Sequence, residues 1–122
     1  MGEVDRPWRV VATRPADRDI LNIIAFIGQR EGPDMAEAIL DKFVQARKSL
    51  SQLPERGRIS PEMKRVNVLS YRKIHVPPYR IVYQVHKDTH TVSIHIVADG
   101  RRNMTELLKE RLLTIPNETP IL

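Results

Sequence analysis

The fold is decided by residues 71–85, which read YRKIHVPPYRIVYQV. β-Branched and aromatic residues alternate with polar ones on both sides of Pro77-Pro78, which is the pattern of two strands joined by a turn. Three basic residues, Lys73, His75 and Arg80, lie on or beside these strands. Burying an unpaired cation is costly. We therefore expect these side chains either to solvate an exposed face or to line a surface that meets an anion.

Similar runs on either side extend this hairpin into a sheet. Residues 66–76, 79–86 and 91–98 are rich in β-branched and aromatic side chains, and Pro77-Pro78 and KDTH separate them. The spacing predicts an antiparallel meander of three strands. WRVVAT, residues 8–13, predicts a further short strand at the N-terminal end.

Two helices are expected between the first strand and the meander. Residues 15–31 carry isoleucines at the spacing of one helix face, and Gly32 follows as a stop signal. Asp34 and Glu37 have the spacing of an N-cap and its capping box, and Pro54 ends the second helical pattern. The short EGP link makes the two helices antiparallel neighbours.

A last amphipathic helix is predicted over residues 104–113, MTELLKERLL, followed by a tail at 114–122. Ten residues are marginal as an isolated helix, so we expect this one to dock on the rest of the domain. The chain contains no internal repeat. We predict one α+β domain over 1–122, ordered from about 8 to 113, in which an N-terminal strand and a helical hairpin pack on a small antiparallel sheet.

The alternation of side chains assigns the basic residues to one face of that sheet. Ile74 and Val76 should point one way and Lys73 and His75 the other. In the third strand of the meander Val92, Ile94 and Ile96 should share a face, opposite Ser93 and His95. Because two helices can cover one side of a sheet, the other side is expected to be uncovered and to present the cations Lys73, His75, His95 and Arg80.

Composition narrows the function classes. The 122 residues carry a net charge of +5, and the segment 56–80 holds seven basic residues against one acid. Such a balance favours polyanions or an acidic protein partner. No apolar run approaches the ~20 residues that span a bilayer, and the first residues lack the apolar core of a signal peptide. We expect a cytoplasmic protein with no membrane partner.

Metal and cofactor chemistry is not expected. The chain has no cysteine, which excludes disulfides and thiolate metal sites. His86 and His90 bracket a turn and, with His95, suggest a metal site, but zinc usually needs three or four converging ligands. We interpret them as polar hairpin residues. The sequence also lacks the glycine-rich spacing of a phosphate-binding loop.

Three pieces of the chain resemble one protein family. LSQLPERGRISPEM, YRIVYQV and VSIHIVADGRRNMTELL, together with the order of elements, are similar to the RelE/ParE superfamily of toxins from bacterial type II toxin–antitoxin modules. The resemblance runs from about Val10 to Leu113. It implies two possible activities. RelE-type members cut messenger RNA on the ribosome, whereas ParE-type members share the fold and poison DNA gyrase.

The superfamily pattern transfers unevenly to this chain. Lys73 and His75 fall where RelE has two strand lysines, and Arg80 falls on a RelE arginine that contacts phosphate. Arg101 or Arg102 falls near a further arginine. RelE also has a tyrosine in its C-terminal segment, whereas this chain has no tyrosine after Tyr83. VADGRRN resembles the ParE pattern more closely.

We therefore predict a ParE-like toxin that inhibits DNA gyrase by binding, without catalysis, in a plasmid-stabilisation module. Its predicted basic functional surface comprises Arg72, Lys73, His75, Arg80, Arg101 and Arg102. The resemblance implies a small ParD-like antitoxin as partner, with a DNA-binding N-terminal part and an acidic amphipathic C-terminal part, in a hetero-oligomer. One alternative is a RelE-like ribosome-dependent endoribonuclease in which Lys73, His75 and Arg80 are catalytic. Another is a non-toxic homologue that binds an antitoxin.

Overall fold

The four strands form one mixed sheet in the order β1-β4-β3-β2. The computed structural model describes residues 6–59 and 71–114, with side chains as far as residue 111. The strands are β1 (Arg9–Ala12), β2 (Tyr71–Val76), β3 (Tyr79–His86) and β4 (Thr91–Asp99). The predicted meander is confirmed for β2, β3 and β4, although residues 66–70 of its first strand lie outside the described residues. The N-terminal strand joins the same sheet, parallel to β4.

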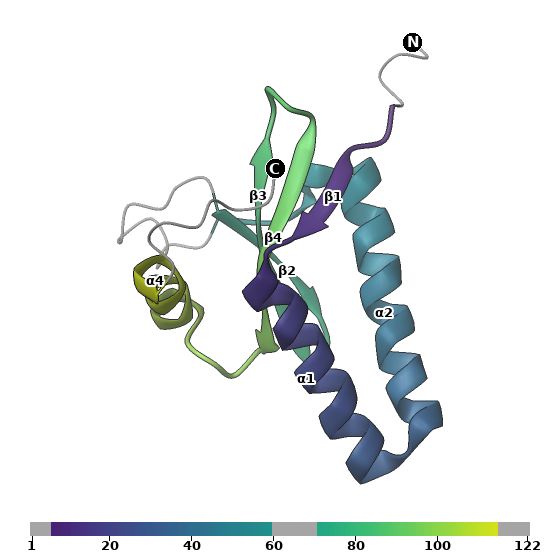
Figure 1. Ribbon diagram of the computed structural model, residues 1–122. Helices are drawn as coiled ribbons and strands as arrows, with labels where there is room; N and C mark the ends of the chain where they lie inside the picture. The colour runs from purple at the N-terminus through teal and green to yellow at the C-terminus, as the bar shows by residue number, and fades with distance from the viewer. Residues whose placement is uncertain (1–5, 60–70, 115–122) are drawn as a thin grey trace.

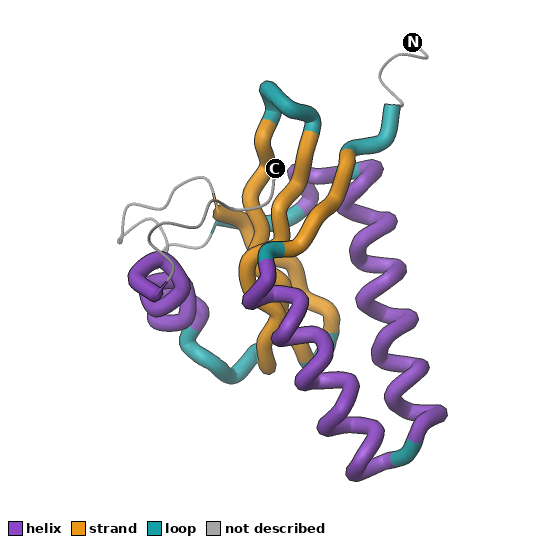
Figure 2. Tube along the Cα trace, viewed as in Figure 1, coloured by secondary structure: helices purple, strands orange, loops and turns teal. Residues whose placement is uncertain are grey.

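Helices lie on both faces of this sheet (Figure 1). The hairpin of α1 (Arg14–Glu31) and α2 (Pro33–Gln52) covers one face, and the shorter α4 (Met104–Thr114) packs against the other. Figure 2 shows the strands between these two helical layers. A single 3-10 turn, η2 (Pro54–Arg56), follows α2. The predicted α+β class is confirmed. None of the described helices is both long enough and apolar enough to cross a membrane.

The helix boundaries follow local capping chemistry with one correction. Thr13 caps α1, and its side-chain oxygen accepts a hydrogen bond from the Ala16 N–H at 3.3 Å. Gly32, with φ of 95°, ends α1 as predicted. The predicted capping box of Asp34 and Glu37 is wrong, because α2 begins at Pro33 and Asp34 lies in its first turn. Proline has no N–H to satisfy and a φ suited to the first helical position, so the helix starts before Asp34.

A β-bulge in β4 divides the core into two clusters. Tyr83 pairs with Ile94 and Val82 pairs with Ile96, so His95 is an extra residue with no partner on β3. One extra residue reverses the side-chain alternation beyond it. Val92 and Ile94 therefore face the helical hairpin, whereas Ile96 faces α4. The prediction that Val92, Ile94 and Ile96 share a face is wrong for Ile96.

The sheet face that was predicted to be uncovered is partly covered by α4. The buried cluster on that face contains Tyr71, Val82 and Ile96 of the sheet and Met104, Leu107 and Leu108 of α4. The prediction that the C-terminal helix docks on the domain is confirmed.

His95 also lies on that face but is 7% exposed, so its expected place among the free cations is wrong. Its Nε2 lies 2.9 Å from the Ser93 hydroxyl, which lies 2.8 Å from Nε2 of His86. Its ring meets Tyr71 edge-on, with 5.1 Å between the ring centroids.

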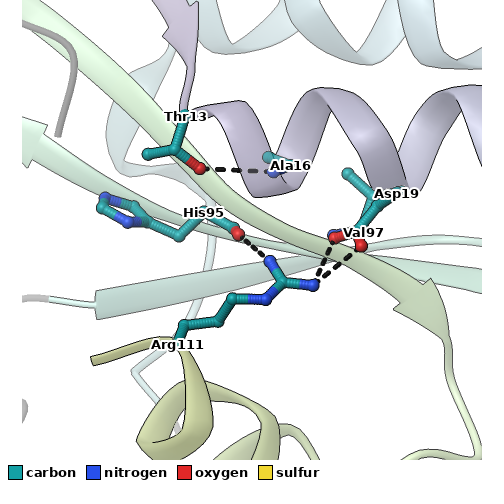
Figure 3. Close-up of polar contacts among 6 residues, drawn as sticks. All are labelled: Thr13, Ala16, Asp19, His95, Val97 and Arg111. Carbon is teal, nitrogen blue, oxygen red and sulfur yellow. Dashed lines mark hydrogen bonds and ion pairs between the residues drawn. The ribbon is translucent and has the colours of Figure 1, made fainter. Parts of the chain in front are cut away.

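Beyond the end of β1, the ion pair of Asp19 and Arg111 forms hydrogen bonds with the backbone of β4 (Figure 3). The backbone hydrogen bonds that continue the pairing of β1 with β4 end with the bond from the Thr13 N–H to the Ile94 carbonyl. Beyond it, the Asp19 carboxylate accepts a hydrogen bond from the Val97 N–H at 2.9 Å. Arg111 donates to the same carboxylate at 2.7 and 3.0 Å and also to the His95 carbonyl. Two side chains thus join α1, the bulge and α4.

We predict that Asp19→Ala destabilises the fold by about 1–3 kcal/mol, because the half-buried Arg111 guanidinium and the Val97 N–H lose their acceptor. Urea unfolding followed by the fluorescence of Trp8 measures this change. Glu37→Ala, at an exposed position on α2, is the control and should stay within about 0.5 kcal/mol of the parent. Equal stability of the two variants would contradict the proposed role of Asp19.

His95 makes stability depend on pH. Burial, followed by the nearby charges of His86 and Arg111, lowers the pKa of His95 from 6.5 to about 4. A histidine whose pKa is lower in the folded than in the unfolded chain contributes stability above its unfolded pKa, and this contribution is lost as the pH falls through the folded pKa. We expect the free energy of unfolding to fall by about 3 kcal/mol between pH 6.5 and pH 4 from this residue.

The measurement is urea unfolding at several pH values in that range for the parent and two variants. His95→Gln, which cannot titrate, should have a shallower pH dependence, whereas Gln45→Ala, at an exposed position, should keep the slope of the parent. Identical slopes for the parent and His95→Gln would refute this assignment.

Candidate functional site

Three of the predicted basic residues meet at the β2 edge of the sheet. His75 on β2 lies directly opposite Arg80 on β3, and Lys73 lies opposite Val82. Val82 belongs to the cluster under α4, whereas Ile74 and Ile81 belong to the core under the helical hairpin. Lys73, His75 and Arg80 therefore share the α4 side of the sheet. His75 is exposed, and the other two are half-buried.

Two further arginines, Arg56 and Arg58, join this group from outside the meander. The N–H of Arg58 donates to the Lys73 carbonyl at 3.1 Å, and the Lys73 N–H donates back at 2.9 Å, which places the segment after η2 alongside β2. Both arginines lie in the basic segment 56–80, but they were not among the predicted site residues. That charge run was the available signal, and the non-local backbone pairing is what brings them to β2.

Together these cations line an open hollow of about 470 Å³, here called the cationic hollow. Its lining residues are Arg56, Gly57, Arg58, Lys73, Ile74, His75 and Arg80. Among these described residues there is no acidic side chain and no Phe, Tyr or Trp ring. Charges of one sign around a concave surface concentrate the field, so the hollow attracts anions.

Hydrogen bonds with side chains of β2 and β3 hold the turn that carries Arg56 and Arg58. The Arg72 guanidinium donates to the Gly57 carbonyl at 2.7 Å and to the Glu55 carbonyl at 3.3 Å. Tyr83 Oη accepts a hydrogen bond from the Gly57 N–H at 2.8 Å. Burial raises the pKa of Tyr83, so this phenol stays neutral. Arg72, which was predicted to lie on the functional surface, contacts the backbone of this turn and is not among the residues that line the hollow.

Glycine is required at position 57. A Cβ there would lie 2.5 Å from Tyr83 Oη and 2.8 Å from the Lys73 carbonyl oxygen. Distances below 3.0 Å force one of the partners to move. The close approach of this turn to β2 and β3 therefore depends on the absence of a side chain.

Arg80 has a buried donor with no acceptor. Its Nε is enclosed and makes no hydrogen bond within the described part of the chain. Gly100 covers this atom, since a Cβ at Gly100 would lie 3.2 Å from it. A buried donor without a partner has a free-energy cost, and such a group calls for a specific explanation.

The last two predicted site residues lie elsewhere, in the turn after β4. Arg101 forms an exposed ion pair with Asp99, with Nε 3.2 Å from Oδ1. Hydrogen bonds from the Arg101 N–H and then from its guanidinium lower the pKa of Asp99, and the Asp99 carboxylate raises the pKa of Arg101. Arg102 lines a different hollow of about 620 Å³ between α1 and α4, together with Phe26 and Arg111. Neither arginine lines the cationic hollow.

An apolar groove lies on the other side of the molecule, between β1, α1 and α2. It has a volume of about 430 Å³, and its lining includes Ile20, Leu40, Phe43 and Val44. Leu40 and Val44 are 41% and 43% exposed. The isoleucine stripe of α1 is only partly buried, in contrast to the buried stripe of α2. Apolar surface of this kind at the rim of a groove makes it a candidate protein-binding site.

The other histidines form no metal centre in the described part of the chain. His90 stacks on Trp8 with 4.1 Å between ring centroids, and His86 contacts Ser93. No three histidine, aspartate or glutamate side chains gather as ligands there.

Known structures share this fold. The chromosomal ParDE toxin–antitoxin system of P. aeruginosa matches with a TM-score of 0.63 and 20% identity, over 77% of this chain and 97% of that one. The toxin–antitoxin complex RelBE2 of Mycobacterium tuberculosis matches with a TM-score of 0.51 and 20% identity, over 76% of this chain and 91% of that one. A comparison with curated protein sequences gave no match.

The family assignment rests on the sequence itself. The model of the ParE toxin of the type II toxin–antitoxin system, parDE, matches residues 10–104, which is most of the chain. The fold, with its helical hairpin on one sheet face and its short C-terminal helix on the other, agrees with that match. The chain therefore belongs to the ParE toxin family of type II toxin–antitoxin systems.

Proposed function

We propose that this ParE-family toxin acts on DNA gyrase as a binding inhibitor in the cytoplasm, and that its module stabilises the replicon that carries it. Membership of the ParE family is the observation that carries the proposal. The composition of the cationic hollow agrees with a binding role. Its described lining has one histidine, His75, and no carboxylate or tyrosine to act with it as an acid–base pair, and Arg101 and Arg102 lie outside the hollow.

The partner that restrains the toxin is an antitoxin, and we propose that it occupies the apolar groove. The half-buried isoleucines of α1 and the exposed Leu40 and Val44 provide an apolar seat between two helices and β1. An amphipathic segment buries its apolar side in such a groove. The toxin carries a net charge of +5, so an acidic antitoxin segment complements it and speeds association.

A RelE-like ribonuclease is the second candidate, and one observation favours it. His75 and Arg80 are cross-strand neighbours, and Lys73 lies on the same side. A base and two phosphate-binding cations could therefore act on one phosphodiester, with His75 removing a proton from the ribose 2′-hydroxyl and the cations stabilising the phosphorane.

Antitoxin binding tests the groove. We predict that Leu40→Glu combined with Val44→Glu weakens the affinity for the antitoxin of the same module at least about tenfold, because carboxylates would be desolvated in the interface. Isothermal titration calorimetry with the purified antitoxin measures the loss. Leu53→Glu, at a position that is 63% exposed outside the groove, should bind like the parent. Unchanged affinity in the double variant would place the antitoxin elsewhere.

Induced expression without antitoxin tests the target. We predict that incorporation of labelled thymidine falls before that of labelled methionine, together with an SOS response, and that His75→Ala still arrests growth, because the other four basic side chains of the hollow remain. Earlier loss of methionine incorporation, abolished by His75→Ala, would replace the gyrase proposal with the ribonuclease. Normal growth with soluble protein would indicate a homologue that binds an antitoxin without being toxic.

A further inference from the structure

We propose that the cationic hollow binds the phosphate backbone of duplex DNA, so that the toxin contacts DNA as well as protein at its target. The inference rests on the proposed function, because DNA is the substrate that gyrase holds. It goes beyond that function by assigning a ligand class to Arg56, Arg58, Lys73, His75 and Arg80.

The charge pattern of the hollow fits closely spaced anions. Its five basic side chains come from η2, the segment after it, β2 and β3, and its described lining contains no carboxylate to neutralise them. Duplex DNA presents one negative charge per ~1.7 Å of its axis, so one such surface can meet two or three phosphates at once. Three of the five are arginines, whose forked guanidinium groups match the oxygens of a phosphate.

The buried Arg80 Nε supports a ligand with acceptor oxygens. This N–H is without a partner among the described residues, yet its side chain lines the hollow. Lysine cannot offer this donor, whereas arginine can use it beside its terminal nitrogens. This donor would gain an acceptor if the side chain turned from beneath Gly100 toward a phosphate at the hollow.

The absence of two residue classes from the described lining favours a duplex backbone over single-stranded RNA. Recognition of unpaired bases uses aromatic side chains as stacking platforms, and the described lining has no Phe, Tyr or Trp, its one aromatic ring being the imidazole of His75. Adenine edges are read by Asn or Gln and cytosine edges by Asp or Glu, and the described lining has none of these side chains. Cations alone bind phosphates irrespective of base sequence.

The cationic hollow is also separate from the apolar groove that we propose for the antitoxin. The groove lies on the helical-hairpin face, where β1, α1, α2 and residues Ile81, Ile94 and Val97 of β3 and β4 line it, whereas the hollow lies at the β2 edge of the sheet. A toxin built this way can keep one surface for the antitoxin and another for its target.

Fluorescence anisotropy of a labelled short duplex, titrated with the purified toxin between about 50 and 200 mM NaCl, tests the inference. We expect the association constant to fall with salt, with a log–log slope of about −2 to −3 for two or three phosphates. Arg58→Ala should weaken binding and make the slope shallower by about 1, equally for duplexes of different sequence. Lys42→Ala, on the exposed surface of α2, is the matched control and should bind like the parent.

Arg80→Lys tests the contribution of the buried Nε–H separately from that of the positive charge. It keeps the cation and removes the Nε–H, so we expect weaker binding with an unchanged salt slope. Thermal unfolding of each variant verifies that it is folded.

Four outcomes would overturn the inference. They are no rise in anisotropy at the lowest salt concentration, equal loss in Arg58→Ala and Lys42→Ala, tighter binding of single-stranded RNA than of duplex DNA, and equally tight binding of poly-glutamate. A supercoiling assay distinguishes this failure from failure of the proposed function. Gyrase inhibition without DNA binding would contradict the inference alone, whereas DNA binding without gyrase inhibition would contradict the proposed target alone.

Discussion

The architecture depends on which groups form hydrogen bonds with the backbone of β4 along the edge where β1 ends. β1 pairs with β4 through Ala12 opposite Ile94, and the chain then turns into α1. The backbone of β4 continues to Asp99, so its outward groups need other partners. Asp19 takes the Val97 N–H, and Arg111 binds both Asp19 and the His95 carbonyl. This arrangement fixes α1 and α4 on opposite sides of one strand (Figure 3).

The bulge at His95 determines what each sheet face carries. By reversing the alternation it directs Ile96 toward α4 and Val97 toward the hairpin, so a single strand contributes to both cores. α4 can then dock on the second face at Tyr71, Val82 and Ile96. The part of this face nearest β2 keeps Lys73, His75 and Arg80, which α4 does not bury.

The two candidate interaction surfaces differ in kind and lie in different parts of the molecule. The groove beside β1 is apolar because α1 packs its isoleucine stripe only partly against the sheet. The hollow beside β2 is cationic because a glycine turn, held by Arg72 and Tyr83, brings Arg56 and Arg58 to the strand. An acidic, amphipathic antitoxin suits the first surface, and a polyanion suits the second.

Local patterns in the sequence were sufficient for the elements, their order and the α+β class. Periods of two and of 3.6 residues, Gly32 and the paired prolines each report on a few neighbouring residues, and helices and strands form on that scale. The same reasoning identified Lys73, His75 and Arg80 as cations on one face, because strand alternation holds between Tyr71 and Val82.

Tertiary structure alone decided the rest, because those features depend on contacts between distant residues. One extra residue at position 95 moved Ile96 to the other face, and no local pattern predicts a bulge. The backbone pairing of Arg58 with Lys73 placed two more arginines in the hollow, while Arg72 turned to backbone carbonyls. The sequence by itself thus determined the elements and the sign of the charge. Packing decided which faces are covered and which cations meet.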